Sequence, residues 1–178
     1  MPYDSGLAFV RDVAALRAAM GVAAAYLPPP PGAERDPFDY VPEMSRRARG
    51  FTIYAALRSL GRQGIAEIVE RTCRVAREIA DSLAVVPGAT ILNEVVLNQV
   101  LVRFDDDETT RDVVRRVQDE GTAWFGGTTY HGTVAARISV SNWATTEADG
   151  RRTVAAISRC LADARAARRD GRAAGPGG

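Results

Sequence analysis

The sequence predicts an α/β chain in which an N-terminal strand and loop lead through long connecting helices into an α+β lobe. Three observations support this. A proline run at Pro28–Pro31 excludes helix and central strand, apolar residues from Ile65 to Leu83 recur every three or four positions, and Val100, Val102 and Phe104 fall on one face of an extended segment. We expect the lobe to have two layers, with helices on one face of a mostly antiparallel sheet.

The first segment comprises residues 1–44. The short apolar run Gly6–Val10 predicts a buried strand, and the Ala/Leu-rich stretch Val13–Met20 predicts a helix. An irregular loop over about 26–40 follows, because four prolines fix the backbone and remove N–H donors. A loop of this length is either functional or a plain linker.

The second segment, residues 45–84, is predicted to contain the connecting helices. Ser45 is a possible N-cap, and Gly61 and Gly64 interrupt the helical pattern. The stripe that starts at Ile65 indicates a helix of about five turns with one face toward a core. Pro87-Gly88 ends it.

The third segment, residues 85–167, is the predicted α+β domain. We expect strands over 89–92 and 98–104, then a helix that begins in the acidic run Asp105–Glu108. That run lacks the spaced oxygen ligands and the glycine of a calcium loop. A strand at Ala123–Phe125, a Gly126-Gly127 turn and a strand over 135–141 follow.

The final helix is expected to start at Thr145 or Thr146, where Glu147 and Asp149 match the positive end of the helix dipole. Residues 168–178 are predicted to form a disordered tail. The lobe therefore has the order strand, strand, helix, strand, strand, helix.

Composition excludes several classes of function. The 178 residues carry 23 cations, all of them arginine, against 22 anions, and a net charge of +1 gives no field suited to nucleic acid. Two separated cysteines and one histidine do not make a zinc site. We find neither a leader pattern nor an apolar stretch long enough to span a membrane, so we expect a cytoplasmic protein without a membrane partner.

A few polar residues are candidates for chemistry, although no nucleophile triad can be assembled with a single histidine. Each also has an ordinary structural explanation. Tyr26 could be a packing aromatic, the arginines at 46, 47 and 49 part of a solvated or ion-paired helix face, His131 a turn residue and Arg137 a structural ion pair.

Taken together, several segments resemble the pyridoxal-phosphate-dependent amino-acid decarboxylases, the group that includes aromatic-amino-acid and glutamate decarboxylases. The segments that carry the resemblance are Pro2–Val10, Asp36–Arg49, Ala55–Gly61, Leu97–Phe104 and the run from Gly126 through His131 and Arg137 to Asp149. The resemblance implies the C-terminal portion of a PLP-dependent transferase-like fold: the last strand and mobile loop of the large cofactor domain, the connecting helices and the small domain. It also implies an amino-acid substrate, and a homodimer or a complementary large domain as partner.

The absence of lysine gives this resemblance a chemical consequence. In the family, a His-Lys motif precedes the segment that matches Pro2–Gly6, and the cofactor rests as an imine on that lysine. This chain contains no lysine, so the resemblance implies a lyase fragment that does not bind pyridoxal 5'-phosphate covalently and is inactive alone. Two alternatives are a non-catalytic dimerisation or regulatory module for a full-length decarboxylase, and a free lobe that binds a small carboxylate.

The resemblance also implies roles for individual residues. Tyr26 matches a tyrosine on the mobile loop that protonates the substrate carbon after carbon dioxide leaves. His131 and Arg137 match positions near the substrate. The remaining assignments are Tyr3 near the cofactor, and Arg46 and Arg47 in interdomain or dimer ion pairs.

Overall fold

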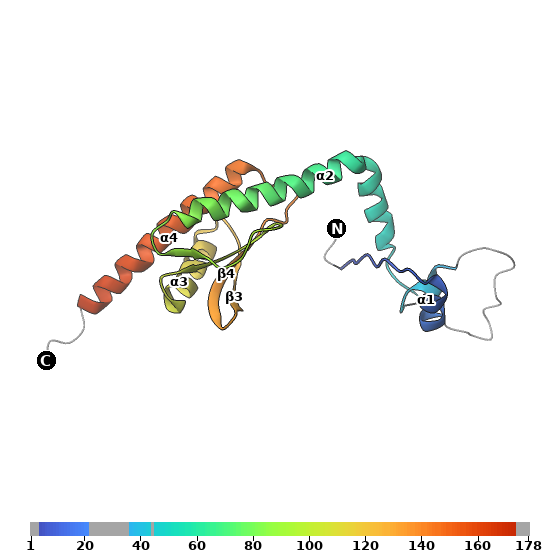
Figure 1. The fold of residues 1–178 in the computed structure, drawn as a ribbon, viewed down its shortest axis with the longest axis horizontal. Coiled ribbons are helices and arrows are strands. Elements are labelled where there is room, and N and C mark those ends of the chain that lie inside the picture. Colours follow the sequence, from blue (N-terminus) through green and yellow to red (C-terminus); the bar gives the residue numbers. More distant parts are fainter. Residues whose placement is uncertain (1–3, 22–35, 44, 174–178) are drawn as a thin grey trace. The chain divides into compact units, whose positions relative to one another are not determined.

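The structure is a computed structural model that describes residues 4–21, 36–43 and 45–173. It divides into two compact units, Met1–Gly61 and Arg62–Gly178, and each is described by itself. Figure 1 shows the elements of both units in chain order.

The first unit contains two short helices that pair with each other. The helix predicted over 13–20 is confirmed as α1 (Val13–Met20), capped by Asp12, whose side chain accepts a hydrogen bond from the Ala15 amide at 3.0 Å. A 3₁₀ helix, η1 (Pro37–Tyr40), replaces the irregular backbone expected there. The 2.7 Å ion pair between Arg17 and Asp39 joins the two.

The strand predicted over Gly6–Val10 does not form. Leu7, Phe9 and Val10 are exposed, and Phe9 is 95% accessible. The prediction fails because a strand needs a neighbour to satisfy its backbone, and no second strand lies in the described part of the first unit. Its described residues include none that is buried, so the described part of this unit has no core.

The long connector α2 (Arg49–Ala84) begins four residues later than Ser45, so the predicted N-cap is wrong. The residues before it form an irregular turn in which the Arg49 amide donates to the Arg47 carbonyl at 2.8 Å. Gly61 has φ 64° and ψ −178°, which interrupts the helix where the two units meet. Only a residue without a side chain adopts that conformation readily.

The second unit contains the predicted lobe, which is confirmed. Its sheet has the order β1-β2-β4-β3, and every neighbouring pair is antiparallel. The strands are β1 (Ala89–Ile91), β2 (Gln99–Phe104), β3 (Gly126–Tyr130) and β4 (Thr133–Ser139).

The helices of this unit pack on one face of the sheet. They are the second part of α2, α3 (Asp107–Glu120) and α4 (Glu147–Ala173). Val100, Val102 and Phe104 are fully buried against them, as the alternation predicts. Gly150 lets α4 approach α2, because a Cβ there would lie 3.0 Å from Val75 Cγ1.

The β3–β4 hairpin corrects two predictions. Residues 123–125 are not a strand and Gly126-Gly127 is not a turn; β3 itself starts at Gly126. The turn lies at His131 and Gly132, whose φ values of 47° and 78° match the type I′ geometry that suits the twist of a two-residue hairpin.

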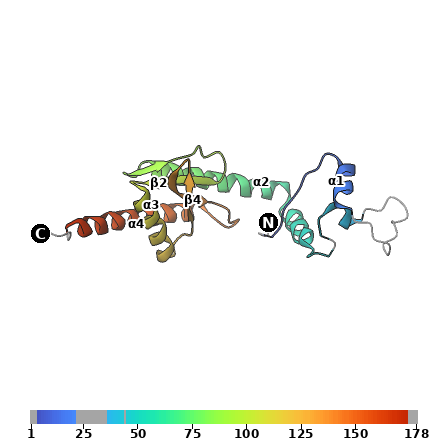
Figure 2. The same cartoon turned by 90° about the horizontal axis from the view of Figure 1, so that it is seen from below.

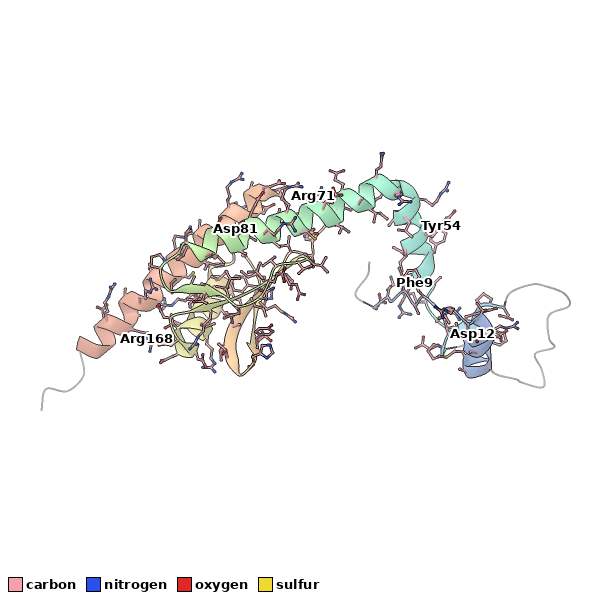
Figure 3. The ribbon with its side chains drawn as sticks, in the orientation of Figure 1. Phe9, Asp12, Tyr54, Arg71, Asp81 and Arg168 are labelled. Atoms are coloured by element: carbon pink, nitrogen blue, oxygen red, sulfur yellow. The ribbon has the colours of Figure 1, made fainter. Side chains whose placement is uncertain are left out.

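Helix α4 begins as predicted but ends later. Thr146 and Asp149 cap its start reciprocally, with the Thr146 amide donating to the Asp149 carboxylate at 3.0 Å. The tail expected from Arg168 is wrong for residues 168–173, which are helical and extend past the sheet in Figures 1 and 2. Arg168, labelled in Figure 3, pairs with Asp106 at 2.7 Å. Residues 174–178 lie outside the described part.

Candidate functional site

An arginine-lined pocket of about 460 Å³ lies within the first unit. One wall is the segment 4–7, and the other is the turn before α2 together with its first residues. Arg49 Nε donates to Asp4 Oδ2 at 2.9 Å, and Arg47 lies 3.8 Å from the same oxygen. Arg46 donates to the carbonyls of Glu43 at 3.1 Å and of Pro37 at 3.3 Å.

Asp4 and Ser5 make one wall of this pocket polar. The hydrogen bond from Arg49 lowers the pKa of the Asp4 carboxyl, so this carboxylate stays ionised. Ser5 Oγ is buried and has no hydrogen-bond partner among the described residues. The pocket can therefore hold a polar group, but it presents no pair of nucleophile and base.

A second candidate site is the face of the sheet opposite the helices. Arg137 on β4 lies between Leu101 of β2 and Gly126 of β3 in the register, and its side chain is exposed. It makes no hydrogen bond or ion pair with the described residues. Arg103 of β2 points to the same face, contacts Asp107 at 3.1 Å and keeps a buried Nε without an acceptor. Two guanidinium groups on one face suit a carboxylate ligand.

His131 lies at the other end of the hairpin from Arg137. It occupies the β3–β4 turn, and its ring meets that of Tyr130 edge to face at 4.2 Å between centroids. Six residues of extended chain separate it from Arg137, which corresponds to roughly 20 Å. The structure therefore does not bring these two predicted substrate residues together, and the role of His131 near the substrate remains a prediction.

The other predicted site residues fall into two groups. Tyr3 and Tyr26 lie outside the described residues, so their roles remain predictions. Arg46 and Arg47 are described: Arg46 bonds to the carbonyls of Glu43 and Pro37, and Arg47 lies near Asp4, all within the first unit. Their role in interdomain or dimer contacts also remains a prediction.

Sequence reasoning missed two residues of these sites, Ser5 and Arg103. Ser5 and Arg49 meet at the pocket although more than 40 residues separate them, and nothing local signals that approach. Arg103 alternates with the buried Val102 and shares the face of Leu101 along β2, so its face was predictable. Its position diagonal to Arg137 depends on the strand register, which no local pattern encodes.

Within residues 4–21, 36–43 and 45–173, no group of three or more His, Cys, Asp or Glu side chains could hold a metal ion. None of the helices in these ranges combines the length and apolar character that crossing a membrane requires.

Comparison with known proteins assigns the family. The sequence model described as "Pyridoxal-dependent decarboxylase conserved domain" matches residues 1–105, which is more than half of the chain. The chain therefore belongs to the pyridoxal-dependent decarboxylase family, and the resemblance drawn from the sequence is confirmed at that level.

Individual relatives support the fold. The structure of Oryza sativa TDC with PLP and tryptamine matches with a TM-score of 0.78 and 20% identity, over 86% of this chain and 34% of that one. Mouse CSAD matches with a TM-score of 0.72 and 16% identity, over 85% and 35% of the respective chains. A probable glycine dehydrogenase (decarboxylating) subunit 1 of Erythrobacter litoralis is 34% identical over 74 residues, 42% of this chain and 16% of its own length. The chain thus spans about a third of the length of these solved structures.

The residues of this chain do not fit covalent attachment of the family's cofactor. Pyridoxal phosphate chemistry uses a lysine amine to hold the aldehyde, and these 178 residues contain none. A guanidinium group does not take the place of an amine in that imine, so the arginines that line the pocket do not replace the lysine. Any lysine that serves this chain must come from sequence outside these residues.

Proposed function

We propose that this chain is the C-terminal part of a pyridoxal-phosphate-dependent amino-acid decarboxylase, acting in the cytoplasm, and that its 178 residues are inactive without a lysine-bearing large domain. The observation that carries the proposal is a family match over residues 1–105 in a sequence that has no lysine. The two free, buried cysteines, Cys73 and Cys160, are consistent with a reducing compartment.

The first unit supports the need for a second domain. Its described residues include none that is buried, while Leu7, Phe9, Phe51 and Tyr54 are exposed. Figure 3 labels Phe9 and Tyr54 in this unit. Large exposed apolar side chains on a unit without a core indicate a surface that another domain covers.

The proposed roles follow from side-chain chemistry. A phenol such as Tyr26 can deliver a proton to carbon from a loop that excludes water. Arg137, exposed and without an ion-pair partner in the described residues, can orient a carboxylate of the substrate. Tyr3 is assigned to the surroundings of the cofactor, and His131 to the substrate side of the small domain. Arg46 and Arg47 are assigned to contacts with the large domain or with a second subunit.

A complementation experiment tests the proposal. The chain is assayed for carbon dioxide release with pyridoxal phosphate and the common amino acids, alone and joined to the large domain encoded upstream of its Met1 codon. We expect no release from the chain alone, release from the joined protein, and loss of release when Tyr26→Phe is introduced. Unrelated coding sequence upstream of Met1, without an in-frame His-Lys, would contradict the proposal.

The lack of lysine also favours a second candidate function, a non-catalytic module that dimerises with or regulates a full-length decarboxylase. The module would bind through the exposed apolar side chains of the first unit. Size-exclusion chromatography of a mixture with a full-length decarboxylase from the same organism tests it. A stable monomer that leaves the enzyme's activity unchanged would exclude this function.

A further inference from the structure

A pocket of about 380 Å³ lies in the second unit, where the loop before β3, the chain that leaves β4 and the first turns of α4 meet. Ile79, Ile138 and Val140 line it and belong to the buried core between the sheet and the helices. Successive side chains of a strand point to opposite faces, so Arg137 points away from the side of β4 that Ile138 shares with this core. The pocket is therefore separate from the sheet face that carries Arg137.

Trp124 gives the pocket an apolar surface that the protein itself leaves uncovered. Its side chain lines the pocket and is 79% exposed, whereas the neighbouring Phe125 is only 5% exposed. An indole ring outside the core has a face available for an apolar group. Together with the buried isoleucine and valine side chains, this ring suits a ligand with an apolar or aromatic body.

The side chains that line the pocket offer free hydrogen-bond donors. Trp124 Nε1 and Asn142 Nδ2 make no hydrogen bond with the described residues, although Asn142 Oδ1 accepts from the Ala144 amide. Arg152 contacts Asp149 Oδ1 at 3.4 Å, which leaves most of its N–H groups without an acceptor in the described part of the chain. These donors and the cation suit an oxyanion.

The one carboxylate in the pocket is already satisfied. Asp149 Oδ2 accepts from the amide of Thr146 at 3.0 Å and from its hydroxyl at 2.7 Å, and Oδ1 faces Arg152. These contacts offset the negative charge of Asp149. One arginine beside one aspartate favours a singly charged carboxylate over a doubly charged phosphate.

We propose that this pocket binds a small carboxylate with an apolar or aromatic body, its carboxylate on Arg152 and its body against Trp124. The volume lies within the range of roughly 300–1,000 Å³ that small-molecule sites occupy. A guanidinium group can donate to both oxygens of such a ligand. Trp124 precedes β3 and Arg152 belongs to α4, so the ligand joins two segments that are distant in sequence.

Phenylacetate tests the site, and phenylacetamide is its uncharged counterpart. The sequence contains two tryptophans, and Trp143 does not line the pocket, so Trp143→Phe leaves Trp124 as the sole indole. We expect phenylacetate to change the fluorescence of Trp124 saturably, with a dissociation constant on the order of 1 mM for so small a ligand. Phenylacetamide should bind about tenfold more weakly, because it lacks the charge that pairs with Arg152.

Arginine variants in the same background locate the carboxylate. Arg152→Gln should raise the dissociation constant of phenylacetate about tenfold. The matched control Arg151→Gln removes an exposed neighbouring cation that does not line the pocket, and it should change the constant less than about twofold. Arg137→Gln should also stay within about twofold, because Arg137 points to the other face of the sheet.

Each result decides for or against the site, and the comparison of the two probes does not depend on the folding of an arginine variant. The absence of saturable fluorescence change up to about 20 mM phenylacetate, or equal binding of the two probes, would overturn the proposal. So would equal effects of Arg151→Gln and Arg152→Gln. A tenfold rise with Arg137→Gln alone would place the carboxylate on the outer face of the sheet and overturn it too, while leaving the proposed function intact.

Discussion

The turn at Gly88 gives the sharpest test of how the second unit is held together. Gly88 has φ +82°, and a Cβ there would overlap Arg165 and Asp105, which form a 2.7 Å ion pair across the turn. Arg165 also donates to the Pro87 carbonyl at 2.7 Å. Gly88→Ala therefore adds left-handed backbone strain of about 1 kcal/mol and displaces a partly exposed arginine whose contacts contribute roughly 1–2 kcal/mol. We expect the free energy of unfolding to fall by about 2–3 kcal/mol.

Gly121→Ala is the matched control for Gly88→Ala. Gly121 has φ +77° at the end of α3, and a Cβ there meets no atom within 4 Å. It should cost only the backbone strain, about 1 kcal/mol. Urea unfolding followed by far-UV circular dichroism measures both. Adding Arg165→Ala should reduce the difference between the two alanine substitutions, leaving only the overlap with Asp105. Equal costs in the wild-type background would refute the argument that the side chain of Arg165 occupies the space beside Gly88.

Three further predictions concern the same unit. The amide of Thr109 and the guanidinium of Arg168 lower the pKa of Asp106, so this carboxylate stabilises the fold above about pH 4 and loses its effect as the pH falls. Asp106→Asn keeps a capping oxygen but loses the negative charge, so it should lower the melting temperature at pH 7. It should also reduce the fall of the melting temperature between pH 5 and pH 3. The same fall in the variant as in the wild type would contradict this. Leu161 is 1% exposed, so Leu161→Ala should lower the free energy of unfolding in urea by about 2–4 kcal/mol. Leu97 is exposed, so Leu97→Ala should change this free energy by no more than about 0.5 kcal/mol. Equal losses would be evidence against the described core. Burial and Glu120 raise the pKa of the Cys160 thiol to about 11, so iodoacetamide at pH 8 should alkylate it far more slowly in folded than in urea-unfolded protein, and equal rates would show that it is accessible.

The parts of the fold that were predictable are those set by local periodicity. The alternation through Val102 gives the buried face of β2, and the three-and-four spacing around Ile79 gives the buried face of α2. The acidic residues after Phe104 were assigned to the start of a helix, and Asp106 indeed caps α3. Each of these patterns lies within a few residues of its consequence.

The predictions that failed depend on partners distant in sequence. Residues 123–125 have a higher β-propensity than the glycine-rich segment Gly126–Tyr130. Nevertheless Gly126–Tyr130 is the strand, because it pairs with β4. The composition around Arg168 is typical of disorder. However, Arg168 forms an ion pair with Asp106, 62 positions away in sequence, and this pair holds Arg168 at the start of α3.

The candidate site was predictable only in part, for the same reason. The polar face of β4 was visible in the alternation around Arg137, so its exposure was expected. The hydrogen bond from Arg49 to Asp4 joins residues 45 positions apart in sequence. The Nε of Arg103 is buried without an acceptor because of packing on the sheet. Neither arrangement has a local signature.

The central claim, that this chain needs a lysine from outside its own 178 residues, is tested most directly by reductive trapping. The chain is incubated with pyridoxal phosphate, reduced with borohydride, digested and mapped by mass spectrometry. Our account predicts no stoichiometric phosphopyridoxyl group on any side chain and no absorbance band of a bound imine, because no amine side chain is present. A stoichiometric adduct on an internal residue, accompanied by carbon dioxide release from an amino acid, would contradict it.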